Sequence, residues 1–258
     1  MAAILDPQEK MDQESIIIDA AGMHYRLLNE RIRNAIAQGY REIVLNGVNG
    51  QRYIADGLIS DVRMVINGVP GNDLGAFMDG PTVVVNDNAQ DGVGNTMNNG
   101  TIVVRGNAGD VVGYGMRGGR IFVKGDVGYR VGIHMKSFKE QVPVIVAGGR
   151  AGDFFGEYMA GGVLVLLGFT AADAPLVGNY LGTGMHGGTI FIRGEPEESQ
   201  LGREVRVFSL RGEDEDYLGR ILDDFAEETG TGLSGAPLSQ FRALRPYSHR
   251  PYGGMYVY

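Results

Sequence analysis

The 258-residue chain contains no cysteine and no tryptophan, and it has only nine prolines. Without cysteine there is no disulfide, no thiolate metal site and no cysteine nucleophile. No apolar run approaches the 18 residues that a membrane-spanning helix needs, and a basic-then-apolar signal sequence is absent from the start of the chain. These absences favour a cytoplasmic protein.

Positively charged residues are also fewer than negatively charged ones. Lysine and arginine number 23 against 31 aspartates and glutamates, which gives a net charge of −8 at neutral pH. The basic residues do not form a stripe. Because nucleic acids and anionic membrane surfaces are recognised by concentrated positive charge, we expect neither to be a main partner.

Glycine, in contrast, is abundant, with 42 residues against an average usage of roughly 7%. The glycines belong to a repeat in which a short β-branched run is followed by turn residues, a glycine and, three residues later, a methionine. The repeated methionines are Met78, Met97, Met116, Met135, Met159 and Met185, and the glycines are Gly75, Gly94, Gly113, Gly132, Gly156 and Gly182. The spacings are 19, 19, 19, 24 and 26 residues, and residues 137–141 and 170–176 are insertions in the two longer intervals. A period near 20 residues is typical of a solenoid.

The residue types indicate which solenoid to expect. The β-branched runs are short and are bounded by Gly, Asn and Asp, as strands between tight turns are. Eight strand ends can be counted, at Gly47, Gly68, Asp87, Gly106, Gly125, Gly148, Gly168 and Gly194. We therefore predict an all-β fold, a single-stranded right-handed parallel β-helix of about seven coils, each built from about three short strands. The methionines should form a column inside it, and the glycines should lie at corners that need positive φ or close approach.

Three segments follow from this pattern: residues 1–61, the repeats at 62–194, and residues 195–258. Within the first, we predict a strand over 15–19, a helix over 23–38 and a degenerate coil over 42–57. Within the last, we predict a helix over 214–229 that stops at Gly230. The two helices are expected to cap the two ends of the solenoid.

The C-terminal tail, Phe241 to Tyr258, is rich in tyrosine and arginine and cannot build a core of its own. It must pack along the coils or dock on another subunit, since these residue types are enriched where proteins bind one another.

Motifs that could carry chemistry are weak. Gly113–Gly118 and Gly182–Gly187 both match G-x-G-x-x-G, but each runs into a strand rather than opening a helix, so nucleotide binding is not predicted. The loop 86–92 offers oxygen ligands but lacks the bidentate glutamate of an EF-hand, and we predict Asx turns there.

His134 and His186 adjoin repeated methionines and are expected to face outward at one corner of different coils, too far apart for a shared metal. No serine lies in a nucleophile elbow, and no carboxylate pair recurs. The sequence therefore predicts no catalytic, cofactor-binding or metal-ligating residue, and no cofactor.

The repeat, as in Gly106–Val123, resembles the Gly-x-x-Gly-x-x-x-Gly repeat of the C-terminal β-helix of the glutamate synthase large subunit. The resemblance is strong over residues 62–194 and weaker over 15–57. Similar domains occur as a separate β-helix subunit in formylmethanofuran dehydrogenase and in the formyltransferase/hydrolase complex. The strand and helix near the start and the Pro-Tyr-rich ending are similar to stand-alone subunits of split glutamate synthases.

The resemblance implies a non-catalytic assembly subunit of a split glutamate-synthase-like complex that serves glutamate biosynthesis. Its partners would be a glutaminase chain, which carries the catalytic cysteine, and a flavin-binding synthase chain. The alternative is the β-helix subunit of a formylmethanofuran dehydrogenase or formyltransferase/hydrolase complex of one-carbon metabolism. A third class, a free-standing enzyme or sugar-binding β-helix, would need clustered carboxylates that the sequence does not offer. Association with further copies of the chain is compatible with each interpretation.

Overall fold

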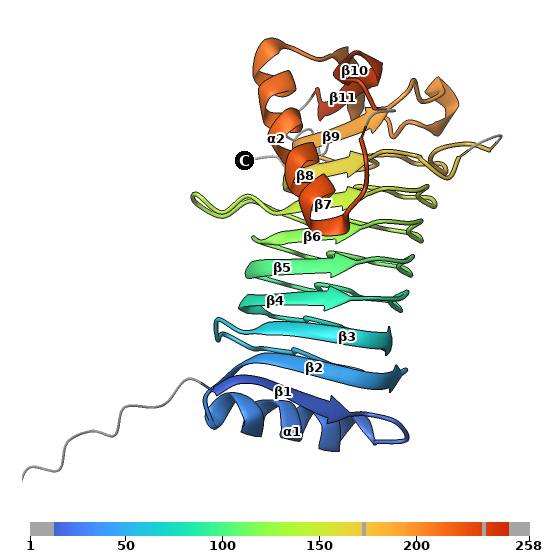
Figure 1. Ribbon diagram of the computed structural model, residues 1–258. Helices are drawn as coiled ribbons and strands as arrows, with labels where there is room; N and C mark the ends of the chain where they lie inside the picture. The colour runs from blue at the N-terminus through green and yellow to red at the C-terminus, as the bar shows by residue number, and fades with distance from the viewer. Residues whose placement is uncertain (1–12, 172–173, 234–235, 248–258) are drawn as a thin grey trace, which may run out of the picture.

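The computed structural model describes residues 13–171, 174–233 and 236–247, and it shows a parallel β-solenoid of about six turns, close to the seven predicted. Nine strands stack in chain order and pair in parallel (Figure 1). They are β1 (Gln13–Asp19), β2 (Tyr40–Asn49), β3 (Arg63–Val69), β4 (Asp79–Val85), β5 (Asn99–Val104), β6 (Arg120–Val123), β7 (Val144–Ala147), β8 (Ala160–Leu166) and β9 (Gly187–Arg193). The predicted all-β solenoid is confirmed.

Each turn of the solenoid contains fewer strands than we predicted. One strand is followed by a single bridging residue, and the bridging residues Ala89, Ala108, Val127, Ala151 and Val177 pair in parallel from turn to turn. A tight turn then leads back to the next strand. The prediction of three strands per coil was wrong. Residues of the tight turn, such as Gly113 (φ 68°) and Gly115 (φ 59°), adopt positive φ, which is incompatible with an extended strand.

The predicted inner columns are confirmed. All six repeated methionines are completely buried. All six glycines that precede them have φ between 67° and 75°. A β-carbon added at any of these glycines would lie 2.2 to 2.8 Å from a side chain of a following strand. Both reasons for glycine, the dihedral angle and the close approach, therefore apply at every corner.

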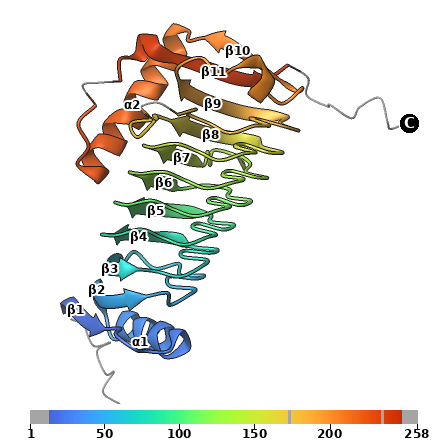
Figure 2. The same ribbon diagram turned by 90° about the vertical axis from the view of Figure 1, so that its right-hand side faces the viewer.

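Helix α1 (Tyr25–Ala37) caps the N-terminal end, as predicted. It begins after His24, whose side chain accepts a hydrogen bond from the backbone N–H of Arg26. Leu28, Ile32 and Ala35 are buried and continue the core that the solenoid encloses. In Figure 2 the helix lies beneath β2, beside β1.

Helix α2 (Gly212–Thr229) ends at Gly230 (φ 67°), but its predicted position was wrong. It lies along the side of the solenoid, next to β6 to β8 in Figure 1, and does not close the C-terminal end. Phe225 is completely buried and packs edge-on against Phe122, with ring centroids 6.0 Å apart. The outward-facing side chains of this sheet face, including Val103 and Val146, are apolar and need a cover, which α2 provides.

The C-terminal end is closed by two antiparallel strands instead. β11 (Phe241–Pro246) pairs with β9 on one side and with β10 (Val205–Ser209) on the other. The self-packing interpretation of the tail is therefore confirmed for this part, and residues 248–258 lie outside the described residues. Two short 3₁₀ helices, η1 (Glu198–Gln200) and η2 (Leu238–Gln240), complete the secondary structure that the described residues form.

Candidate interaction surface

The two histidines singled out in the sequence are both exposed but do not share a position in the repeat. His134 precedes Met135 and has φ 56°, whereas His186 follows Met185 and its Nδ1 lies 3.3 Å from the carbonyl oxygen of Gly184. The expectation of one common corner was wrong, because the residues fall on opposite sides of their methionines. Within the described part of the chain, no three His, Cys, Asp or Glu side chains come close enough to hold a metal ion.

The oxygen-rich loop at 86–92 has a structural role that links successive turns of the solenoid. Asn88 Oδ1 accepts a hydrogen bond from the backbone N–H of Asn107 at 2.7 Å, and Asn107 Oδ1 accepts from Asp126 at 2.8 Å. Asp91 Oδ1 likewise accepts from the N–H of Asp110 at 2.9 Å. We predicted that these side chains form Asx turns within the loop. They mainly accept hydrogen bonds from backbone N–H groups of the next coil of the solenoid instead, and so satisfy those donors.

The two G-x-G-x-x-G matches, 113–118 and 182–187, begin in the turns at 112–115 and 182–184, and the chain then runs into β6 and β9. Neither opens a helix, so the predicted absence of a dinucleotide fingerprint agrees with the local structure.

Sequence reasoning missed an aromatic surface on the turns. Two positions in each repeat, one and five residues before the methionine, lie at the tips of the turns and adopt positive φ. In the later turns these positions carry mostly bulky side chains. Tyr114 directly precedes one of these positions, Gly115. We call this surface the turn ridge and define it by six residues: Tyr114, Arg130, His134, Phe154, Tyr158 and Tyr180.

The turn ridge consists of two columns of stacked groups. In the first, the His134 ring stacks on Tyr158 at 5.4 Å and meets the edge of Tyr114 at 5.9 Å. In the second, the rings of Phe154 and Tyr180 stack at 4.8 Å, and the guanidinium of Arg130 lies over Phe154 at 4.6 Å.

A buried carboxylate orients the arginine of the second column. Glu157 is only 7% exposed, and its Oε2 accepts a hydrogen bond from Arg130 Nε at 2.9 Å. The guanidinium is thereby oriented while about half of the Arg130 side chain stays exposed. An oriented guanidinium loses little side-chain entropy when a partner binds it.

The backbone under the turn ridge indicates a function beyond folding. Five of its residues have φ between 51° and 63°, a region that costs a non-glycine residue about 1–3 kcal/mol. Glycine occupies three of the equivalent positions, Gly92, Gly115 and Gly184, so the fold does not require a side chain there, whereas the earlier turns carry Asp73, Phe77, Thr96 and Val111. Tyrosine and arginine are the residues that dominate binding energy in protein interfaces. Comparing the residues one and five before each methionine would have revealed this surface from the sequence.

Among the described residues, two titratable groups have shifted pKa values, and neither belongs to the turn ridge. Burial raises the pKa of Asp56, while the neighbouring Arg33 opposes the shift and Asp73 adds to it. Burial likewise raises the pKa of Tyr217 on α2, against the effect of Arg120 and Arg220. These groups are not paired with each other, so they do not form an acid–base site.

Comparison with known proteins assigns the repeat. The family model of the GXGXG motif matches residues 30–248, most of the chain. The chain belongs to the GXGXG motif family. This confirms the resemblance to the C-terminal β-helix of the glutamate synthase large subunit.

Two further matches extend the comparison. The uncharacterized protein MJ1350 of Methanocaldococcus jannaschii is 46% identical over 256 residues, which cover 95% of this chain and 97% of the relative. Among solved structures, a chain of the formyltransferase/hydrolase complex FhcABCD of Methylorubrum extorquens, solved with methylofuran, matches with a TM-score of 0.55. That match covers 76% of this chain and 71% of the other at 22% identity, and it shows a common fold.

None of the helices in the described part of the chain combines the length and the hydropathy that crossing a bilayer requires.

Proposed function

We propose that this GXGXG-family chain is a non-catalytic assembly subunit of a multi-subunit complex and that the turn ridge binds one of its partner chains. The observation that carries the proposal is the set of stacked aromatic side chains held on left-handed backbone, at positions that glycine can also occupy. The left-handed backbone lowers the stability of the fold at these positions. The exposed tyrosine and arginine side chains that it carries are residue types that contribute most to binding between proteins.

The parent complex that we favour is a split glutamate-synthase-like assembly with a glutaminase chain and a flavin-binding synthase chain. The family match over residues 30–248 supports it. In this arrangement the solenoid performs no chemistry. Its rigid stack of turns fixes the distance and orientation between the catalytic chains.

The second candidate is a formyltransferase/hydrolase complex, because the solved structure that matches is a chain of such a complex. At 22% identity this likeness supports the fold, and it supplies no residue-level argument for the partner. The two candidates differ in which chains should bind.

A reconstitution distinguishes them. The chain is mixed with the glutaminase and synthase chains from its own source, and separately with formyltransferase/hydrolase chains, and the affinity is measured by interferometry. We expect binding to the first set. Binding only to the second set would replace the parent complex, and binding to neither would overturn the assembly role.

The same assay tests the turn ridge. Tyr158→Ala should weaken binding of the partner by about 10- to 100-fold, as truncation of a central tyrosine does. The matched control is Phe138→Ala, which removes an exposed ring (54% exposed) in the insertion at 137–141, outside the turn ridge. Equal affinities for both variants and the wild type would remove the turn ridge from the proposal.

A further inference from the structure

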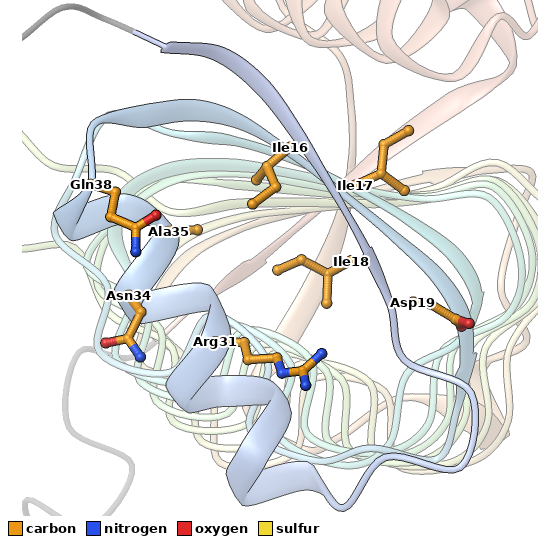
Figure 3. Close-up of a pocket in the computed structure, with 8 residues that line it drawn as sticks. All are labelled: Ile16, Ile17, Ile18, Asp19, Arg31, Asn34, Ala35 and Gln38. Atoms are coloured by element: carbon orange, nitrogen blue, oxygen red, sulfur yellow. The ribbon is translucent and has the colours of Figure 1, made fainter.

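The N-terminal end of the sheet is unpaired in the described structure. The strand order begins at β1, and β2 is its one neighbour in the sheet. Ile16 and Ile18 point toward α1, whereas Ile17 and Asp19 lie on the opposite side of the strand (Figure 3). Ile17 is 68% exposed, which is unusual for a β-branched residue in the middle of a strand.

Among the described residues, no strand pairs with the outer edge of β1, which therefore presents unpaired backbone groups. The N–H of Ala20 donates to the carbonyl oxygen of Asn46, the last residue of β2 that pairs with β1, at 2.7 Å. Backbone groups alternate from side to side along a strand, so those of Ile18 face β2 and those of Ser15 and Ile17 face outward. Such a row of donors and acceptors is a template for another strand.

Helix α1 leaves this edge open because it lies beside β1. A hollow of about 390 Å³ separates the two elements. The hollow is lined by apolar groups of Ile16, Ile18 and Ala35 and by the polar side chains of Arg31, Asn34 and Gln38 (Figure 3).

We propose that β1 pairs with β1 of a second copy of this chain, antiparallel across a two-fold axis at Ile17. This register places Ile17 opposite the second copy's Ile17 and Ile16 opposite its Ile18, so the apolar core continues across the junction. It also uses the outward-facing groups of Ser15 and Ile17, which an antiparallel pair centred on Ile17 requires.

The charge of this end favours a copy of the same chain. A two-fold interface must be complementary to itself. The chain as a whole carries a net charge of −8, yet the hollow beside β1 is lined by both signs, Asp19 and Arg31. Two copies can therefore approach here without the repulsion that an acidic end would cause. This inference is independent of the proposed function.

The absence of cysteine allows a direct test with the full chain. Ile17→Cys is purified and exposed to a mild oxidant. Directly opposed residues in an antiparallel pair lie about 5.5 Å apart at Cα, within disulfide range, so we expect a disulfide-linked dimer. Ile59→Cys, at a residue that is 78% exposed elsewhere, is the control and should remain uncrosslinked.

Sedimentation velocity provides a second readout. The wild-type chain should dimerise with increasing concentration, and Ile17→Lys, which opposes two ammonium groups, should weaken the dimer by at least about tenfold. Mixing Ile17→Lys with Ile17→Glu should restore it. Because the side chain is exposed, both variants should melt like the wild type.

Three results would overturn the proposal. One is a wild-type chain that stays monomeric at its highest soluble concentration, and another is equal crosslinking of Ile17→Cys and Ile59→Cys. The third is a dimer that Ile17→Lys does not weaken, or that the charge-matched mixture does not restore. If β1 amides became protected from hydrogen exchange only on adding a partner chain, the occupant would be that chain and not a second copy.

Discussion

A β-carbon added at Gly113 would lie 2.2 Å from Cδ1 of Ile145, a side chain that comes from strand β7. Gly113 also has φ 68°, in the left-handed region. The corner glycine of one coil and a core side chain of a later coil are therefore in close contact, with no room for a side chain at the glycine. The same relation recurs between Gly94 and Ile121, where the distance is 2.3 Å.

This relation predicts that Gly113→Ala destabilises the chain by about 1–3 kcal/mol. Ile145→Val removes Cδ1, so the double variant should lose less stability than the sum of the two single changes. Denaturant melts of the four proteins measure the coupling.

Gly219→Ala is the matched control, since an added β-carbon at this position in α2 meets no atom within 4 Å. It should raise the unfolding free energy by about 0.5–1 kcal/mol because alanine is the better helix former. A Gly113→Ala variant as stable as the wild type would contradict the packing relation.

Most of the fold could be predicted because the repeat fixes it. The methionine spacing gave the register, and the glycines gave the corners. What failed was the position of α2. Its apolar face was evident, but the sequence alone did not show that Val103 and Phe122 face outward and leave a surface to cover.

The turn ridge escaped prediction for a different physical reason. Tyr158 and Tyr180 lie 22 residues apart in sequence, and their different positions relative to the methionines conceal the two columns. Stacking across turns becomes visible once the turns are placed above one another. The pairing of Phe241 with β9 could not be predicted either, because β11 is antiparallel and does not follow the repeat.

Truncation of the tail tests the contribution of β11. Deletion after Tyr247 leaves β11 intact and is the reference for a second cut. Deletion after Ala243 removes the buried Leu244 and half of a strand that pairs on both sides, and it should lower the melting temperature sharply. Thermal melts followed by circular dichroism compare the two truncated chains, and equal melting temperatures would contradict the stabilising role of β11.

Asp56 predicts a pH dependence of stability. Its pKa in the folded chain is raised above 3.8, chiefly by burial, so the folded state binds more protons than the unfolded state as pH rises past that value. This contribution is fully present below pH 3.8 and is lost as pH rises through the folded pKa.

Asp56→Asn removes this ionisation. The variant should gain stability relative to the wild type between pH 3 and neutral pH, as measured by urea melts at each pH. The comparison isolates Asp56 because the other carboxylates titrate in both proteins. A stability difference that does not change with pH would show that the burial of Asp56 has no such effect.

Tyr180 separates the strain of the turn ridge from its binding. Both Tyr180→Ala and Tyr180→Gly lose the ring, but only alanine keeps a β-carbon at φ 61°. The alanine variant should be about 1 kcal/mol less stable than the glycine variant. Both should bind the partner equally weakly, by interferometry. A glycine variant that is less stable than the alanine variant would show that the left-handed backbone is not strained here.

We propose that this chain assembles a complex and performs no chemistry itself. Native mass spectrometry of the purified chain tests this role directly, with the chain alone and after addition of the glutaminase and flavin-binding synthase chains, and with glutamate synthase activity measured on the same samples. We expect an inactive, flavin-free chain that joins the other two in a complex of fixed stoichiometry. Stoichiometric flavin retained by the isolated chain, or activity without the other chains, would contradict it.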